Sequence, residues 1–353
     1  MKFESHSVIL LGPYKGFSKT NGSGVNRYAY ELHKNLQKIT RNVVDKLETT
    51  RLFGIGTGLS FSLLASTNRY KNYRIVHNLF SDPMLHLSQR KIFITTIHEM
   101  QMLLNKELNQ DMESGFKNQL WLNLIGLPGL KLSLKSDYVI VPSIQASQEV
   151  ASTGFDSKRI FIVNNGIDER FLKPILKKRH RKFIVGYVGA LRRRKNVVFA
   201  IRAFKKISDI DIEFHIYGKP AYDYKEIYKE ALSDKRIIFK GFADEKKLVD
   251  VYDSFDVFVF PTLYESHSPL LLEARARGLP TIIYRNSIMS EENRKFCFEA
   301  EDESHMARII ETLKINGFKE ELRNKQIQYA QKFTWMKTAK DTATVYKKIL
   351  LKH

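Results

Sequence analysis

The sequence predicts an α/β protein built from two doubly wound domains, each with a parallel sheet covered by helices on both faces. Three observations support this prediction. The chain has 353 residues, which is more than one hydrophobic core usually organises. Short strand-like segments alternate with helix-like segments along most of its length. The strand-like segments carry Val, Ile and Phe at successive positions, as strands buried on both faces do.

In the first half, five apolar segments are predicted to be strands: SVILLG, YRIVHNLF, KIFITTIH, DYVIVPS and RIFIVNN. Two segments between them, VNRYAYELHKNLQKI and IQASQEVAS, are predicted to be helices. The segment 43–72 fits neither pattern, so no element is predicted there. This half forms the first domain, residues 1–172.

The alternation is cleaner in the second half. The predicted strands are KFIVGYVG, IEFHIYG, RIIFKGF, VFVFPT and LPTIIY. The predicted helices are NVVFAIRAFKKI, YKEIYKEAL, DEKKLVDVYDSF and PLLLEARARG. We expect the second domain to span residues 183–335, joined to the first by the Pro-containing cationic stretch 172–182.

Composition excludes several classes of protein. A single cysteine, Cys297, excludes an internal disulfide and a multi-cysteine zinc site. No apolar run approaches the roughly 18 residues of a membrane-spanning helix. The opening MKFESHSVILLGPY has an apolar run that suits a buried strand better than a signal peptide. We therefore expect a cytoplasmic protein.

The formal net charge of +20 raises the question of a nucleic-acid partner. Residues 1–179 carry 25 Lys and Arg against 14 Asp and Glu, or +11, and residues 180–353 carry 33 against 24, or +9. Because the excess is spread over both halves, we expect no nucleic-acid partner. An anionic small molecule or an anionic membrane surface accounts for the same bias.

Ligands of parallel sheets bind beyond the carboxyl ends of the strands, so the residues that follow strands are the candidates for a site. Gly22, Ser23 and Gly24 follow the first strand and precede a helix whose N-terminal amides suit a phosphate. The same pattern also occurs in ordinary turns. His98 ends the strand KIFITTIH. For this residue alone, a core histidine bonded to a backbone carbonyl is the favoured interpretation, and a hydrogen bond to a sugar hydroxyl is the alternative.

The segment YVGALRRRKNV follows the first strand of the second domain. Arg194 and Lys195 lie just before a helix, where cations meet the anionic groups of a ligand. Taken singly, each of them is better explained as a solvated charge. Arg192 and Arg193 are expected to be loop residues.

In PTLYESHSPLLLEARARGLPTIIY, a strand ends at a proline and a helix begins near Pro269 and ends before Gly278. This places Glu265 in the loop and Glu273 one to two turns inside the helix. Both carboxylates can accept hydrogen bonds from one hydroxyl-rich ligand. They can also be two solvated charges.

These segments together resemble the retaining glycosyltransferases of family 4. YESHSPLLLEARARGLPTIIY resembles the family's E-x7-E region, with Glu265 and Glu273 as the two glutamates. VGALRRRKNV, VNNGIDERF, ITTIHEM and NGSGVNRYAYEL are similar to its other motifs, in the same order. KFTWMKTAKDTATVYKKIL resembles its closing helix. The resemblance covers nearly the whole chain.

The resemblance implies a GT-B fold, with two Rossmann-like domains facing across a cleft and a closing helix, residues 336–353, crossing back to the N-terminal domain. It implies a retaining, metal-independent hexosyltransferase that uses a UDP- or GDP-hexose and a glycan or lipid-linked oligosaccharide as acceptor. No cofactor is implied beyond the nucleotide-sugar donor. The alternative is a non-catalytic protein, either a basic nucleic-acid binder or a glycosyltransferase-like binding protein.

Roles follow for the matching positions. Arg194 and Lys195 would neutralise the diphosphate, Glu265 would bind the donor sugar and Glu273 the ribose. His98 would contact the sugar near the reacting carbon, and Gly24, with Gly22 and Ser23 beside it, would approach the donor phosphate. The remaining donor-binding positions are Ser266, His267, Ser268, Pro269 and Leu270.

The sequence departs from the family pattern at several positions. Ser266, His267 and Ser268 stand where the pattern has Gly-Phe-Gly, and Ala190 stands where many members carry an arginine. The acidic pair Asp209 and Asp211 precedes a strand, away from the ligand edge, and is predicted to be a surface turn rather than a metal site.

Residues 120–137, LWLNLIGLPGLKLSLKSD, are apolar with scattered lysines. Packing against the N-terminal sheet is the favoured interpretation. The alternative is peripheral contact with the anionic inner face of the cell membrane, which would suit a lipid-linked acceptor. A nucleotide-dependent oxidoreductase is disfavoured, because no GxGxxG with an acidic residue about 20 positions later is present.

Overall fold

The chain forms two compact units, which are described separately. The computed structural model describes residues 7–12, 17, 24–40, 44–48, 72–81, 91–104, 119–120, 122–173, 175, 181–220 and 224–353. Unit 1 comprises Met1–Gly166 together with Thr334–His353, and unit 2 comprises Ile167–Phe333. Unit 2 therefore begins at Ile167, ahead of the expected linker 172–182 and of the expected domain start at 183, and the chain returns to unit 1 at Thr334 rather than at residue 336. Positions 174 and 176–180 of the expected linker lie outside the described residues.

Unit 1 contains a six-stranded sheet in the order β2-β1-β3-β4-β5-β6, and each neighbouring pair is parallel. Five strands confirm predicted ones, and β2 lies in the segment where no element is predicted. The strands are β1 (Val8–Gly12), β2 (Val44–Glu48), β3 (Ile75–Asn78), β4 (Ile92–Thr96), β5 (Tyr138–Val141) and β6 (Ile160–Ile162). The helices are α1 (Gly24–Thr40), α3 (Gln101–Leu104), α6 (Leu127–Ser133), α7 (Ile144–Ser152) and α15 (Trp335–Leu350).

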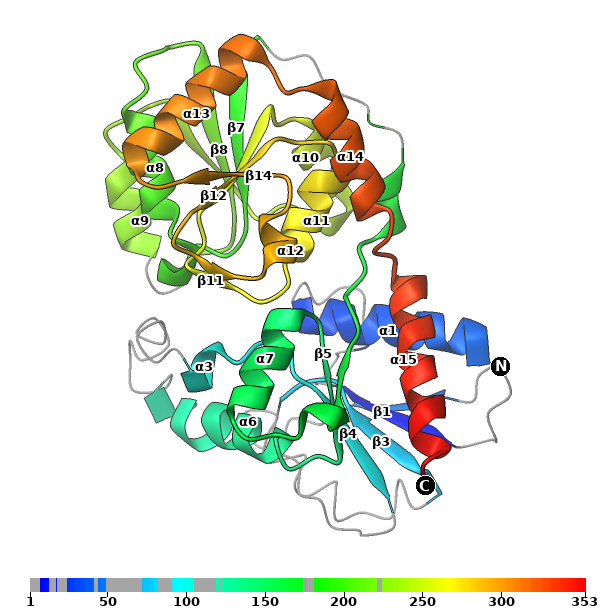
Figure 1. Cartoon of the computed structure of the whole chain (residues 1–353). Helices are drawn as coiled ribbons and strands as arrows, with labels where there is room; N and C mark the ends of the chain where they lie inside the picture. Colours follow the sequence, from blue (N-terminus) through cyan, green and yellow to red (C-terminus); the bar gives the residue numbers. More distant parts are fainter. Residues whose placement is uncertain are drawn as a thin grey trace. The chain divides into compact units, whose positions relative to one another are not determined.

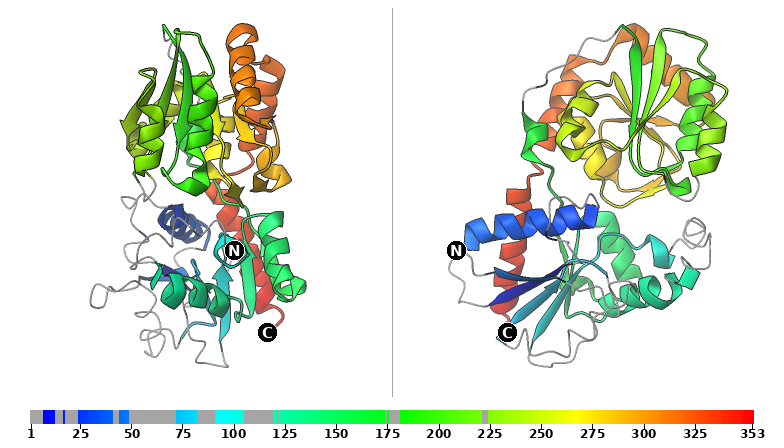
Figure 2. Two further views of the ribbon diagram at one scale, coloured as in Figure 1. Left: turned by 90° about the vertical axis from the view of Figure 1, so that its left-hand side faces the viewer. Right: turned by 180° about the vertical axis from the view of Figure 1, so that it is seen from behind.

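Successive side chains of β5 point into two different cores of unit 1. Tyr138 and Ile140 belong to the core that α1 and α15 cover, whereas Val139 and Val141 pack with residues of α6 and α7. Helices α1 and α15 lie side by side, as the views in Figures 1 and 2 show. The sheet therefore carries helices on both faces, as the apolar strand patterns predict.

Helix α15 is the last element of the chain, yet it supplies part of the core of unit 1. Trp335, Ala339, Ala343, Tyr346 and Ile349 are buried with residues of β1, β3 and α1. The spacing of these residues is that of one apolar helix face. Thr334 begins the helix by accepting a hydrogen bond from the backbone N–H of Lys337 on its side chain.

Unit 2 contains a second parallel six-stranded sheet, in the order β14-β12-β10-β7-β8-β9. Its strands are β7 (Phe183–Val188), β8 (Ile212–Tyr217), β9 (Ile237–Gly241), β10 (Val257–Phe260), β12 (Thr281–Tyr284) and β14 (Cys297–Ala300). Two short strands, β11 (Tyr264–Glu265) and β13 (Ile288–Met289), pair separately. The helices are α8 (Val197–Lys205), α9 (Tyr224–Ala231), α10 (Leu248–Asp253), α11 (Pro269–Ala276), α12 (Glu291–Arg294), α13 (Glu303–Asn316) and α14 (Glu320–Ala330).

The two faces of this sheet also bury different side chains. Val257 and Val259 of β10 pack on the face covered by α8, α9 and α13, whereas Phe258 and Phe260 pack with α10, α11 and α14 (Figure 1). The prediction of two doubly wound α/β units is thus confirmed.

The strand order reverses once in each sheet. In unit 2 the chain moves from β7 outward to β8 and β9, then returns to place β10 on the other side of β7. In unit 1 the same reversal lies between β1 and β3. Loops diverge at such a point, so the carboxyl ends of β7 and β10 are where a ligand of unit 2 would bind.

Candidate functional site

A basic turn follows β7 at the reversal point of unit 2. Arg193–Lys195 form one turn of 3-10 helix, and Asn196 then adopts a left-handed conformation, with φ of 52°, before α8 begins. Asparagine tolerates this conformation better than most residues do. Lys195 is buried to 9% exposure, whereas Arg192 and Arg193 are exposed, as predicted.

Lys195 and Glu265 form a short ion pair. The Nζ of Lys195 lies 2.6 Å from Oε2 of Glu265, and the two side chains are only 11% and 13% exposed. The same ammonium lies 5.2 Å from the centre of the Phe260 ring, at the end of β10. Two residues predicted separately from the sequence are therefore in direct contact.

Arg194 fastens the basic turn to the segment that follows β10. One of its guanidinium nitrogens donates to the carbonyl of Tyr264 at 3.1 Å. Its own carbonyl accepts from the backbone N–H of Leu263 at 2.8 Å and from the hydroxyl of Thr262 at 3.3 Å. The basic turn and the loop before Glu265 thus form one hydrogen-bonded structure.

The segment Ser266–Leu270 leads from Glu265 into α11. The side chain of Ser268 caps the helix by accepting from the backbone N–H of Leu271, and Pro269 occupies the first helical position. Gly278, with φ of 64°, follows the end of the helix. The predicted start and stop of this helix are confirmed. Ser266 is buried, and the His267 ring lies 6.2 Å from the ring of Phe333.

Glu273 lies inside α11 and is fully buried. Its Oε2 accepts a hydrogen bond of 3.1 Å from the hydroxyl of Tyr252 on α10. A buried carboxylate of this kind needs hydrogen-bond donors around it. Tyr252 is therefore a residue that supports the site and that the sequence analysis missed, because its partner lies 21 positions away in the chain.

The unit 1 candidates lie beyond β1 and β4. Gly24 is the exposed first residue of α1, and a Cβ added there would meet nothing within 4 Å. Gly22 and Ser23 lie outside the described residues. The Nε2 of His98 lies 3.0 Å from the carbonyl oxygen of Leu79, and the ring meets that of Tyr28 edge-on at 4.7 Å.

The charge state of His98 follows from its surroundings. Burial lowers the pKa of the imidazole, and the Leu79 carbonyl and Glu99 oppose this effect without cancelling it. A neutral ring that donates its Nε2 proton to Leu79 leaves Nδ1 as a hydrogen-bond acceptor. His98 thus combines the carbonyl bond of a core histidine with a nitrogen suited to a hydroxyl group.

Asn293, on α12, is a second residue missed by the sequence analysis. Its side-chain amide hydrogen-bonds to the backbone of Glu265, Ser266 and Ser268. An asparagine in the polar stretch SEENRK carries no local signal of such a contact.

Acidic residues do not form a metal centre in the parts of the chain that the structure describes, where no group of three His, Cys, Asp or Glu side chains could hold an ion. Asp209 and Asp211 form the predicted turn at the amino end of β8. The backbone N–H of Asp211 donates to Asp209 Oδ1, and the Asp209 carbonyl accepts from Arg236.

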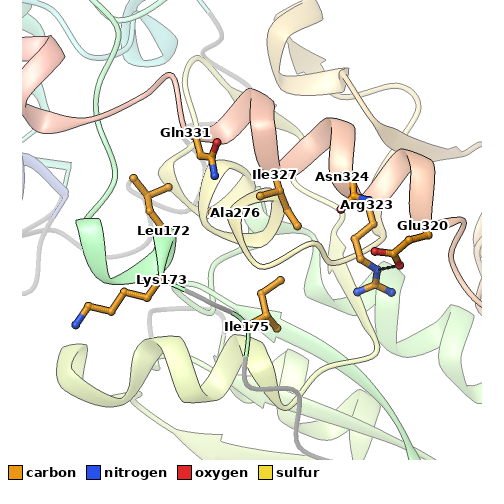
Figure 3. A pocket seen from close by; sticks show the side chains of 9 residues that line it. All are labelled: Leu172, Lys173, Ile175, Ala276, Glu320, Arg323, Asn324, Ile327 and Gln331. Atoms are coloured by element: carbon orange, nitrogen blue, oxygen red, sulfur yellow. Dashed lines mark ion pairs between the residues drawn. The ribbon is translucent and has the colours of Figure 1, made fainter.

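A separate pocket in unit 2 lies between α14, the end of α11 and the segment around Leu172 (Figure 3). Its wall includes Arg323, which pairs with Glu320 at 3.2 Å. None of the predicted site residues lines this pocket. It therefore does not change the location of the candidate site.

Comparison with solved structures identifies the class of fold. Sucrose-phosphate synthase from Thermosynechococcus elongatus superposes with a TM-score of 0.76 at 17% identity, covering 99% of this chain and 100% of that one. The protein thus has the GT-B fold of glycosyltransferases. Within the described residues, no helix is long and apolar enough to cross a membrane.

Sequence comparison then shows what the second unit resembles. Residues 168–333 match the family model described as "Glycosyl transferases group 1". An uncharacterized glycosyltransferase of Methanocaldococcus jannaschii is 30% identical over 171 residues, 46% of this chain and 44% of the relative. The UDP-Gal:alpha-D-GlcNAc-diphosphoundecaprenol alpha-1,3-galactosyltransferase of Escherichia coli is 26% identical over 195 residues, 48% and 50% of the two chains. The matches span about half or less of these relatives.

Proposed function

We propose that this protein transfers a hexose from a UDP- or GDP-hexose to a glycan or lipid-linked acceptor, with retained anomeric configuration and without a metal ion. The observation that carries the proposal is the contact between Lys195 and Glu265 at the carboxyl ends of β7 and β10. A cation that binds phosphate and a carboxylate that binds hydroxyl groups are the two groups that a nucleotide sugar requires at adjacent positions.

In this proposal, Lys195 and Arg194 bind the donor diphosphate. Breaking the bond between the sugar carbon and the phosphate oxygen places negative charge on the leaving diphosphate. Cations placed beside the leaving group stabilise that charge. Here the basic turn is held by the Tyr264 carbonyl and by the bonds to the Arg194 carbonyl.

Glu265 and Glu273 act on the sugar parts of the donor. Glu265 accepts hydrogen bonds from hexose hydroxyl groups once Lys195 turns to the diphosphate. Glu273 accepts from the ribose. Because Glu273 is fully buried in the structure, this contact requires neighbouring side chains to move.

The proposed transfer is a single substitution at the anomeric carbon. The acceptor oxygen bonds to the anomeric carbon from the face that the diphosphate leaves, and the bonding electrons pass to the diphosphate oxygen. The acceptor proton moves to that same oxygen, so no protein base is needed. His98, a neutral ring with a free acceptor nitrogen, orients a hydroxyl of the hexose near this carbon.

A lipid-linked acceptor is favoured by the exposed apolar residues of unit 1. Leu120 and Leu124 are 47% and 64% exposed, and the exposed Lys131 lies on the following helix, α6. Leu122 and Leu130 on the same stretch are buried in unit 1, as expected for packing against the sheet. We include peripheral binding to an anionic membrane in the proposal.

Membrane binding is tested by sedimentation with phosphatidylglycerol vesicles at low salt. Leu124→Ser should reduce the bound fraction, whereas Leu232→Ser, at a leucine of unit 2 that is 63% exposed, should not. Equal sedimentation of all three proteins, or none of the wild type, would remove the membrane part of the proposal.

The donor is tested by a thermal-shift panel of UDP, GDP, ADP and their glucose, mannose and galactose conjugates, without metal. A ligand at 100 times its Kd stabilises a protein by about 2.7 kcal/mol, which such a panel detects. One nucleotide should shift the melting temperature, and Lys195→Ala and Glu273→Ala should each abolish the shift. A panel without any shift would contradict the proposed function.

A further inference from the structure

The loop Glu265–Ser268 is held by the side chain of one residue that no sequence motif marks. The Nδ2 of Asn293 donates to the carbonyl of Glu265 at 3.1 Å and to the carbonyl of Ser266 at 3.2 Å. Its Oδ1 accepts from the backbone N–H of Ser268 at 3.3 Å. Three backbone groups of a four-residue segment are thus bonded to one amide.

The orientation of this amide is determined by its partners. Two carbonyl oxygens can only accept, and one backbone N–H can only donate, so exchange of Nδ2 and Oδ1 would break all three bonds. Asn293 is 3% exposed, so water cannot replace these hydrogen bonds if the amide is removed. No other residue type of the same size offers two donors and one acceptor in this geometry.

Asn293 is itself held from two sides. Its backbone N–H donates to the carbonyl and hydroxyl oxygens of Ser290, the residue that caps α12. The guanidinium of Arg275, on α11, donates to the Asn293 carbonyl. Arg275 is 1% exposed and packs over the Tyr329 ring, with 5.8 Å from its guanidinium carbon to the ring centre. The backbone of Asn293 is therefore bonded both within α12 and to α11.

The bonds of Asn293 act on the part of unit 2 where the hexose is proposed to bind. Glu265 carries the carboxylate that is proposed to bind hexose hydroxyl groups, and Ser268 ends the loop where α11 begins. Asn293 bonds to the backbone at both ends of this loop. It touches the loop from the α12 side, and none of its three loop bonds involves the basic turn.

We propose that Asn293 is a positioning residue that holds the loop Glu265–Ser268 in the conformation that binds the donor hexose. This inference rests on the proposed function. It distinguishes recognition of the hexose from binding of the diphosphate. The cations Arg194 and Lys195 belong to the turn after β7, whereas the side chain of Asn293 bonds only to the loop. Loss of its bonds should weaken recognition of the hexose and leave binding of the nucleoside diphosphate.

The experiment compares Asn293→Asp with Asn286→Asp, the same change at an exposed asparagine of unit 2. The carboxylate at position 293 keeps an acceptor for Ser268 but loses both donors and faces two carbonyl oxygens. Calorimetry measures Kd for UDP and for UDP-glucose, or for GDP and GDP-mannose if the thermal-shift panel selects GDP.

For Asn293→Asp, the Kd of the nucleoside diphosphate should stay within about twofold of the wild type. The Kd of the nucleotide sugar should rise by about tenfold or more, as for the loss of about 1.4 kcal/mol. In a steady-state assay, Asn293→Asp should raise the KM for the nucleotide sugar and lower kcat. Asn286→Asp should match the wild type in every measurement.

Equal weakening of nucleoside diphosphate and nucleotide sugar would overturn the inference, because it indicates general damage to unit 2. Unchanged binding of both would overturn it as well. If Asn293→Asp does not fold, Asn293→Ser is judged by the same ratio of the two Kd values. If the wild type binds no nucleotide sugar, the proposed function fails first, and that result is distinct from any result on Asn293.

Discussion

Lys195 and Glu265 are 70 positions apart in the sequence, yet their side chains meet at 2.6 Å. The contact exists because β7 and β10 are neighbours in the sheet, so the segments that follow them meet at one edge. Each side chain is more than four-fifths buried. The pair therefore links the geometry of the sheet to the charge of the candidate site.

Removing one member of this pair should leave the other charge poorly compensated. We expect Lys195→Met and Glu265→Gln each to lower the free energy of unfolding by about 2 kcal/mol. The double variant should lose less than the sum of the two. Urea unfolding followed by circular dichroism measures this coupling. The exposed pair Lys325 and Glu321 is the control, and its double-mutant cycle should show no measurable coupling.

Tyr252→Phe should test the support of Glu273. The change removes only the hydroxyl that donates to Glu273 and keeps the ring packed among Phe171, Phe255 and Phe258. We expect a loss of about 1–3 kcal/mol in unfolding free energy and weaker nucleotide binding. Tyr228→Phe, at a tyrosine that is 44% exposed, should change neither. An unaltered Tyr252→Phe protein would show that other groups hold the carboxylate.

Arg277 should be among the most sensitive positions of unit 2. Its guanidinium pairs with Asp253 through bonds of 2.7 and 2.8 Å and also donates to the carbonyls of Phe171 and Lys173. Both side chains are almost completely buried. Arg277→Met should cost about 3–5 kcal/mol, because it leaves the Asp253 carboxylate buried without its cation.

The matched comparison for Arg277 is the double variant Arg277→Met with Asp253→Leu. It removes both charges, so its unfolding free energy should exceed that of Arg277→Met alone. A double variant less stable than the single one would mean that the carbonyl bonds to Phe171 and Lys173 matter more than the ion pair.

Unit 1 should lose stability as the pH falls below neutral. Burial, with a smaller effect of His98, lowers the pKa of His77 from 6.5 to about 3. Its ring bonds to Thr96 at 2.8 Å and to the hydroxyl of Tyr346. Between pH 6.5 and pH 3 the unfolded chain binds a proton at this residue and the folded chain does not, so stability is lost as the pH is lowered.

Between pH 7 and pH 5, His77 should account for a loss of about 2 kcal/mol in the free energy of unfolding. His77→Asn should abolish this loss, although it lowers stability at pH 7 by disturbing the buried bonds. Both tryptophans of the chain, Trp121 and Trp335, belong to unit 1, so tryptophan fluorescence follows its unfolding selectively. Parallel pH curves for wild type and His77→Asn would contradict the prediction.

The elements that the sequence predicts are those with strong local patterns. Strands β7 and β10 are continuous apolar runs, and α11 has a serine cap, a proline at its first position and a glycine after its end. Strand β2 was missed because it lies at the edge of its sheet and its sequence VDKLE has two adjacent charged residues, Asp45 and Lys46, which break the alternation of a half-buried strand. Helix α14 was missed because most of its side chains are exposed and few are apolar.

The site divides in the same way. Arg194 and Lys195 come within seven residues of the end of β7, and Glu265 comes five residues after β10, so their place at the ligand edge follows from local sequence. Tyr252 and Asn293 reach the site through tertiary packing, from 21 positions before Glu273 and 28 positions after Glu265. A single sequence carries no signal for such pairs. The return of α15 to unit 1 was expected from the family resemblance, because the helix pattern alone does not contain that packing.

The position of α15 has a consequence for the order of synthesis. Unit 2 is one continuous stretch, so it can complete its structure as soon as residue 333 has left the ribosome. Unit 1 is translated earlier but lacks Trp335, Ala343 and Tyr346 until residues 335–346 emerge. Unit 1 therefore cannot complete its core, and part of its apolar surface stays uncovered, while unit 2 is being synthesised. A nascent chain stalled near residue 333 would expose that surface to chaperones, although every strand of both sheets had already been synthesised.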